Sequence, residues 1–287
     1  MSMVRPARRT IFVTGVTGVL FLLILPALLF AQTNCDEGAG TLNPAKPQES
    51  VDSILQKVAA KETLFQQARN NYTYTQDVSV QTLDGTVVSG EFREVTDILF
   101  DGKGKRLEDV KFAPQSSLVE VSMTKEDVDD VRHRVPFVLT TEDMPQYNLL
   151  YVGTQRVDEI DAYVFDMAPK KFEKDKRYFQ GRLWIDNHDL QIVKTCGKAV
   201  PEVRAGGTGK KKKNVQENLT PTFVTYREQI DGEYWFPTYS RADEVLHFAT
   251  NDVHIREVVK FLNYKRFGSK TRIILKGEAT DDQKPKQ

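Results

Sequence analysis

The chain of 287 residues carries 40 basic and 40 acidic side chains, so it lacks the excess of positive charge that is typical of nucleic-acid-binding proteins. Residues 1–31 contain three arginines and no acid, which leaves 37 basic against 40 acidic residues in the remainder, a net charge of −3. The remaining length is enough for one large β-rich domain or two small ones, and neither needs a metal or a disulfide merely to fold.

The N-terminus has the pattern of an export signal. Three arginines among the first nine residues precede an uncharged apolar run, Ile11–Phe30, and a cleavage point is expected after Ala31. We therefore predict that residues 1–31 are an export signal. The apolar run is also long enough to span a bilayer, so an uncleaved anchor in the inner membrane is the alternative.

Two cysteines are present, Cys35 and Cys196. Exported proteins meet an oxidising environment, so we predict that the two form a disulfide that ties the N-terminal segment to the middle of the chain. Two unpaired thiols are the alternative, because a sequence does not show whether two cysteines lie close enough to be joined.

A flexible leader and a long helix are predicted after the signal. Two glycines and two prolines fall within residues 32–48, a composition typical of a leader without regular structure. In residues 49–69 apolar side chains recur at helical spacing and form one stripe, which we expect a sheet to cover. The stripe consists of Val51, Ile54, Leu55, Val58 and Phe65.

From Tyr72 onward, apolar and polar residues alternate, as they do in β-strands. The pairs Asp84-Gly85 and Asp231-Gly232 stand where tight turns between strands are expected. Strands are predicted over residues 72–80, 86–95, 98–100, 106–112, 147–155, 162–168, two stretches within 178–198, 222–230, 234–245 and 252–265. Strands in such close succession indicate an α+β fold with an antiparallel sheet.

The predicted helices are few for so many strands. Thr124, followed three residues later by Asp127, predicts the start of a short helix that ends at Pro136, and residues 137–145 are interpreted as a connecting flap. A wide, curved sheet with little helical cover would leave a concave apolar surface, where apolar ligands bind. Two sheets packed into a filled sandwich are the alternative.

The stretch YFQGRLWIDNHDLQIVKTCGK, residues 178–198, predicts a hairpin around the turn Asp186–Asp189. If Ile185 pairs with Leu190, then Leu183 faces Ile192, and Phe179 faces Cys196. That side of the hairpin is almost wholly apolar. The opposite side is mixed in polarity and, apart from Trp184, could face solvent.

No catalytic motif is found. The chain has neither a Gly-x-Ser-x-Gly elbow nor a His-Glu-x-x-His pair, and Gly209-Lys210 does not form a phosphate-binding loop because Arg204 stands where a glycine is required. Paired acids that could serve glycoside hydrolysis fall in predicted turns, where carboxylates usually face solvent. A secreted hydrolase is thus disfavoured, and we predict that the protein is not an enzyme.

Candidate metal ligands and basic clusters are weak. His188 lies between Asp186 and Asp189 in the predicted hairpin turn and is expected to be exposed, so no metal site and no cofactor are predicted. The run Lys210–Lys213 is interpreted as a solvated loop, with contact to anionic lipid or an acidic partner as the alternative.

Several stretches together resemble the outer-membrane lipoprotein-sorting family, the LolA/LolB-like carriers of the Gram-negative periplasm. They are VDSILQKVAAKE, NNYTYTQDVSV, YNLLYVGTQRVDEIDAYVFDMAPKK, the hairpin YFQGRLWIDNHDLQIVKTCGK, and DGEYWFPTYSRADEVL. The resemblance implies a periplasmic protein with a strongly curved antiparallel half-barrel over residues 49–270, whose concave face is covered by the N-terminal helix and short helices, followed by a polar tail over 271–287.

The resemblance also implies a function. Members of this family hold the acyl chains of a lipoprotein in an apolar cleft, so the expected partner is an acylated lipoprotein or lipid, with transient membrane contact. A cell-envelope sensor or adaptor that binds a protein partner with the same fold is the alternative. We expect the cleft to be lined by one face of the hairpin, formed by Phe179, Leu183, Ile185, Leu190 and Ile192.

Overall fold

The computed structural model describes residues 33–101, 104–133, 136–202, 219–248 and 251–267. The predicted export signal, the run Lys210–Lys213 and the predicted C-terminal tail lie outside these ranges. Within them, two α-helices accompany one sheet of ten strands, in which every neighbouring pair is antiparallel. The predicted antiparallel sheet is therefore confirmed.

The helices are α1 (Val51–Arg69) and α2 (Lys125–His133), and a single 3-10 turn, η1, spans Met144–Gln146. The strands are β1 (Tyr72–Asp84), β2 (Val87–Phe100), β3 (Arg106–Phe112), β4 (Tyr147–Val157), β5 (Ile160–Pro169), β6 (Tyr178–Asp186), β7 (Ile192–Val200), β8 (Phe223–Ile230), β9 (Tyr234–His247) and β10 (Asp252–Arg266). The two strands predicted over 86–95 and 98–100 are one continuous strand, β2.

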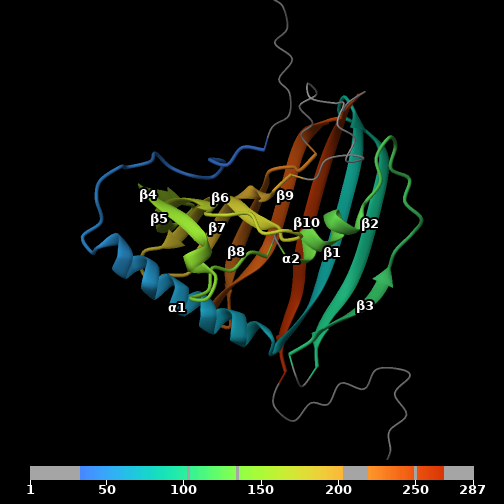
Figure 1. Ribbon diagram of the computed structural model, residues 1–287. Helices are drawn as coiled ribbons and strands as arrows, with labels where there is room; N and C mark the ends of the chain where they lie inside the picture. Colours follow the sequence, from blue (N-terminus) through green and yellow to red (C-terminus); the bar gives the residue numbers. More distant parts are fainter. Residues whose placement is uncertain (1–32, 102–103, 134–135, 203–218, 249–250, 268–287) are drawn as a thin grey trace, which may run out of the picture.

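The spatial order of the strands is β3-β2-β1-β10-β9-β8-β7-β6-β5-β4. Strands β3 and β4 follow each other in the chain but lie at opposite ends of the sheet, so the sheet is open. The connection between them, residues 113–146, carries α2 and must cross from one end of the sheet to the other. Figure 1 shows α2 in front of the long, bent strands β1 and β10, and α1 alongside the half of the sheet that contains β4–β8.

Local sequence explains where both helices begin. The hydroxyl of Ser50 accepts a hydrogen bond from the amide of Ser53 and caps α1. At α2, the predicted pair is confirmed: the amide of Asp127 donates to the hydroxyl of Thr124, and the amide of Thr124 donates to the carboxylate of Asp127. Neither described helix combines the length and the apolar character needed to cross a membrane.

The two faces of the sheet carry different cores. On one face, Ile54, Leu55 and Val58 of α1 pack in a single cluster with side chains from β1, β2 and β4–β10, and we call this cluster the α1-side core. Val131 of α2 and Phe137 of the crossing connection belong to the same cluster. The predicted helical stripe is thus buried against the sheet, as its spacing indicated.

Part of the opposite face, over β4–β8, is covered by residues 33–47. A second cluster on this face contains Trp184, Val193 and Cys196, and the partly buried Ala39 and Leu42 pack against it. Cys35 is joined to Cys196 by a disulfide, with a Cα–Cα distance of 5.5 Å. On this side of the hairpin, Trp184 is fully buried, whereas Gln180 is exposed.

The register of the hairpin differs from the predicted one. Ile185 pairs with Ile192 rather than Leu190, because the turn extends to residue 191 and Leu190 lies within it with a φ of 56°. A bulge then places Leu183 opposite Thr195. Cys196 pairs with Arg182 and belongs to the second cluster, so the prediction that it shares a face with Phe179 is wrong.

The segment predicted as a flexible leader pairs with an exposed sheet edge. Ala39 and Asn43 form isolated antiparallel bridges with Val157 and Thr154 at the free edge of β4. Gly153 permits this approach, because a Cβ atom there would lie 2.2 Å from the carbonyl oxygen of Asn43. The segment thereby satisfies backbone groups that an open edge strand would expose.

We expect the disulfide to contribute to stability through the long loop that it closes. Its cysteines are 161 residues apart, and closing such a loop in the unfolded chain stabilises the folded state by about 2–5 kcal/mol. Urea unfolding of the Cys35→Ser/Cys196→Ser variant should show a loss of this size. Limited proteolysis should then cut within residues 33–47 of the variant before it cuts the sheet; equal resistance of both proteins would contradict the assigned role.

A buried ion pair links α1 to the sheet. Glu62 is fully buried on α1, and its carboxylate lies 3.1 Å from the guanidinium of Arg227 on β8, which is 2 % exposed. The same carboxylate accepts a hydrogen bond from the amide of Ile192 at 3.1 Å. Arg227 also donates to the carbonyl of Phe137 and lies over the ring of Phe65. Both buried charged groups therefore have hydrogen-bond partners in addition to each other.

Breaking this pair on one side should be costly. Glu62→Gln leaves the guanidinium buried without its countercharge, and we expect the free energy of unfolding to fall by about 3–5 kcal/mol in urea titrations. The double variant Glu62→Leu/Arg227→Met should lose less, because no unpaired charge remains. Asp77→Asn is a control, since it removes an ion pair with the exposed Arg93 and should change stability little. Similar losses in the single and double variants would contradict this account.

Candidate functional site

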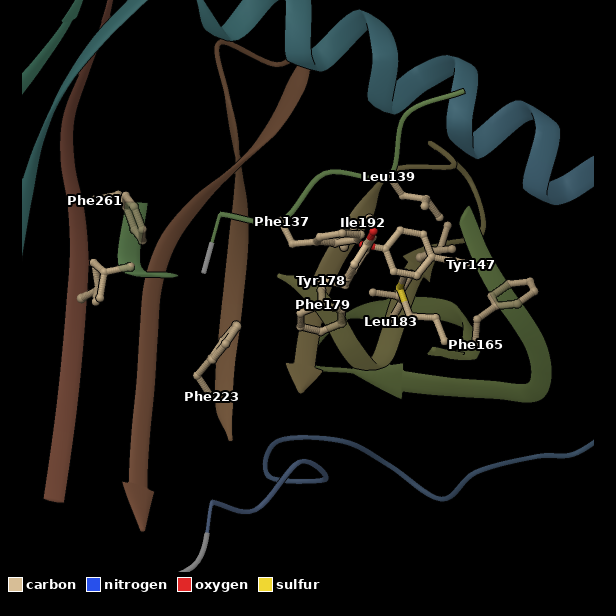
Figure 2. Packing of buried hydrophobic residues seen from close by; sticks show 14 of the residues in the cluster. Phe137, Leu139, Tyr147, Phe165, Tyr178, Phe179, Leu183, Ile192, Phe223 and Phe261 are labelled. Atoms are coloured by element: carbon tan, nitrogen blue, oxygen red, sulfur yellow. The ribbon is translucent and has the colours of Figure 1, made fainter. Parts of the chain in front are cut away.

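The predicted cleft residues lie in a filled core. Phe179, Leu183, Ile185 and Ile192 are each 0 % exposed and belong to the α1-side core, while Leu190 is partly buried at its margin. Phe137 stacks on Phe179 with ring centroids 4.8 Å apart. Figure 2 shows Phe137 and Leu139 reaching from the crossing connection onto the side chains of this face. The five residues share a neighbourhood, as predicted, but side chains of the protein itself occupy the space in front of them.

An apolar cavity of about 440 Å³ lies elsewhere on the same face of the sheet. Its walls come from β1, β9 and β10, from α2 and the segment 118–124 before it, and from residues 219–221. Its apolar lining includes Leu118, Met123, Val80, Leu246, Ile255 and Pro221. We call it the β10 cavity. Its volume is within the range typical of small-molecule sites.

The β10 cavity is open because the helical cover changes there. The long helix α1 contributes Ile54, Leu55 and Val58 to the core, whereas the nine-residue α2 contributes Val131. Among the described residues, the outer ends of β9 and β10 are covered by the segment 118–124, the start of α2 and residues 219–221. This cover is too thin to fill the space over the strands.

One acid stands in the apolar stripe of β10. Ile255, Glu257 and Val259 alternate toward the same face, and Glu257 pairs across the sheet with Val80 and Ala242. Glu257 is partly buried and lines the β10 cavity. Among the described residues, none donates a hydrogen bond to its carboxyl group. An acid at an inward position of the stretch VHIREVVKF was the sequence signal for this site, and the sequence analysis missed it.

The surroundings of Glu257 favour its neutral form. Burial raises the pKa of the Glu257 carboxyl to about 7, and the nearby charges of Asp127 and Asp130 on α2 contribute to the rise. Asp127 is fixed in place because it caps α2 through the amide and hydroxyl of Thr124. Near neutral pH, Glu257 can therefore be present either as a carboxylic acid, which donates a hydrogen bond, or as a carboxylate.

The acids of the hairpin turn have structural partners. Asp186 accepts hydrogen bonds from the amides of His188 and Asp189, at 3.1 and 3.0 Å, and so shapes the turn. Asp189 accepts from the indole of Trp235, which is the main reason that its pKa is lowered. The His188 side chain is 89 % exposed. Asp186, His188 and Asp189 could approach one cation, but their contacts are those of a tight turn.

Two other pockets differ from the β10 cavity in their lining. One, of about 480 Å³, is polar, and two of its arginines are already paired: Arg177 with Asp130, and Arg132 with Glu108. The other, of about 710 Å³, is a shallow groove beside the disulfide on the opposite face of the sheet. Only the β10 cavity, among these three, combines an apolar wall with an acid of perturbed pKa, the combination expected of a binding site.

No protein-family model matches the chain, and no curated protein matches its sequence. Solved structures with a similar chain path include a DUF1329 family protein from Desulfovibrio piger, at 15 % identity and a TM-score of 0.38, covering 76 % of this chain and 94 % of that one. A LolA superfamily protein from Nitrosomonas europaea has 12 % identity and a TM-score of 0.33, covering 77 % and 94 %. A putative outer membrane lipoprotein-sorting protein domain from Vibrio parahaemolyticus has 11 % identity and a TM-score of 0.31, covering 71 % and 90 %.

The LolA and lipoprotein-sorting names on two of these structures are the names to which the sequence resemblance led.

The raised pKa of Glu257 predicts a pH-dependent stability. Between pH 4.5 and 7 the folded protein holds a proton that the unfolded chain has released, so stability should fall as the pH rises through this window. The shift in the pKa of Glu257 corresponds to a loss of roughly 3 kcal/mol at most in the free energy of unfolding. Glu257→Gln should therefore be more stable than the wild type at pH 8 and closer to it at pH 5, in urea unfolding. The exposed Glu228→Gln serves as a control; a constant difference between Glu257→Gln and the wild type at both pH values would contradict the shift.

Proposed function

We propose that the protein is a non-enzymatic, periplasmic binder or carrier of lipoproteins or other acylated molecules, and that it holds an acyl chain in the β10 cavity. The observation that carries the proposal is an apolar cavity of about 440 Å³ on a sheet whose other half is filled. The predicted export signal and the resemblance to lipoprotein-sorting proteins support the same role. In this proposal the sheet is a half-barrel, its concave face is covered by α1 and α2, and the cavity is the uncovered part.

Burial of an acyl chain in the cavity gives enough free energy for binding without a charged residue that anchors the head group. Burying one methylene group contributes about 0.8 kcal/mol, so a segment of about eight methylenes contributes roughly 6 kcal/mol before the costs of association. Binding of this strength is reversible, and a carrier must release its cargo. Contact with a membrane would then be brief and limited to loading or delivery.

The proposal predicts that filling the β10 cavity abolishes binding. Met123→Trp places a large side chain in the cavity, and we expect it to weaken binding of a fluorescent, singly acylated peptide at least tenfold in anisotropy titrations. Leu64→Trp, at a 52 % exposed position on α1, is the matched control and should bind like the wild type. Circular dichroism would establish that both variants are folded.

Two results would count against the proposal. One is the absence of saturable binding by the wild type, together with the absence of copurified lipid in native mass spectrometry. The other is equal binding by Met123→Trp and the wild type.

A second candidate function is that of an adaptor for a protein partner in the cell envelope. The observation in its favour is the edge strand β3, which pairs only with β2 and exposes Val110 and Phe112 by 52 % and 49 %. Exposed edges of this kind accept an added strand from another chain. A copurified partner that is lost from Val110→Lys but retained by Met123→Trp would favour the adaptor over the carrier.

A further inference from the structure

We infer that the β10 cavity accepts amphiphiles whose head group is uncharged or cationic and excludes those that end in a free carboxylate or phosphate. This inference rests on the proposed function and deepens it, because it names the class of ligand. The structure supports it in three ways: the charges that line the cavity, the pairing of Lys198 and Arg256 with acids, and the position of Glu257 in the cavity.

The charged lining of the cavity has one sign. Glu120, Asp127 and Glu257 are among its described lining residues, and none of the described lining residues is Lys, Arg or His. The three acids come from three different elements: the segment before α2, the first turn of α2, and β10. Their charges therefore converge on the cavity from its rim and its floor.

The groups that surround Glu257 do not reverse this sign. The charges of Asp127 and Asp130 on α2 both act on Glu257. Asp130 also forms an ion pair with Arg177, with 2.6 Å between their charged atoms. On β9, Glu244 is buried on the same face, accepts a hydrogen bond from the amide of Thr222, and has a pKa that burial raises.

Two cations around this part of the sheet, Lys198 and Arg256, have acidic partners of their own. Lys198, the cation that acts on Glu244, is paired with Glu202. On β10 itself, Arg256 alternates to the other face of the sheet and pairs with Asp243. None of the described residues that line the cavity is a cation, so the charged groups that an anionic head group meets in this lining are carboxylates.

The floor position of Glu257 determines which heads are favoured. As a carboxylic acid it can donate a hydrogen bond to the carbonyl of an ester or amide, the groups that join acyl chains to an uncharged head. As a carboxylate it attracts a cation. With a pKa of about 7, both forms are accessible near neutral pH. Above this pH the carboxylate form predominates and repels an anion, together with Glu120 and Asp127. Repulsion from two or three carboxylates at distances of several ångström should weaken the binding of an anionic head group by roughly tenfold or more.

Three ligands with the same twelve-carbon chain test the inference. They are 1-monolaurin, which is uncharged, dodecyltrimethylammonium, which is cationic, and dodecanoate, which is anionic above pH 6. Each is used below its micelle concentration to displace the uncharged dye N-phenyl-1-naphthylamine from the full-length protein at pH 8 and at pH 6.

We expect the uncharged and the cationic ligand to displace the dye at concentrations at least tenfold lower than dodecanoate at pH 8. The difference in displacing concentration between dodecanoate and the other two ligands should become smaller at pH 6, and also in Glu257→Gln at pH 8. Both changes remove the charge of Glu257. Glu228→Gln, which removes an exposed acid on β8 outside the cavity, is the matched control and should behave like the wild type.

The outcomes separate the two proposals. Displacement by dodecanoate at concentrations equal to or below those of the other two ligands overturns the inference and leaves the carrier function standing. Displacement by none of the three, or equal displacement from Met123→Trp and the wild type, overturns the carrier function and the inference with it. An unchanged preference in Glu257→Gln, with the expected order in the wild type, overturns the role assigned to Glu257.

Discussion

The ion pair between Glu62 and Arg227 connects the elements that close the core. It joins α1 to β8, the amide of Ile192 adds β7, and the carbonyl of Phe137 adds the crossing connection. A buried charge pair is weak evidence for stability by itself, but its directional contacts fix relative positions that apolar packing leaves free. Here they hold α1 and Phe137 over β6 and β7, and the hairpin face beneath becomes core.

The filled and the open halves of the sheet follow from this arrangement. The face of the sheet that carries the α1-side core is covered by one long helix, one short helix and a connection that crosses between the two ends of the sheet. The long helix is held over the half that contains β4–β8. In the described part of the chain, the far ends of β9 and β10 are covered by the segment 118–124, the start of α2 and residues 219–221. The β10 cavity is what this uneven cover leaves, and an acid within it determines its electrostatic character.

The sequence resemblance implied an antiparallel sheet, which the structure has, and a cleft at the hairpin, where side chains of the protein itself pack in the structure. Alternation in the hairpin correctly identified Phe179, Leu183, Ile185 and Ile192 as one apolar face. The same alternation does not reveal what covers the face, because a wall of a cavity and a wall of a core have the same pattern. Glu257 carried the more informative signal, since an ionisable group at an inward position costs free energy unless its surroundings compensate.

The sequence by itself determined the elements: the helix stripe of α1, the capping pair Thr124 and Asp127, and the succession of antiparallel strands, all of which depend on neighbours in the chain. The tertiary structure alone decided the hairpin register, the pairing of residues 33–47 with the edge of β4, and the location of the cavity. The register depends on the conformation of the turn, in which Leu190 has a φ of 56°. The edge pairing and the cavity depend on contacts between segments more than 100 residues apart, such as Asn43 with Thr154. Local periodicity carries no information about such contacts, because it reflects only which side of an element is buried.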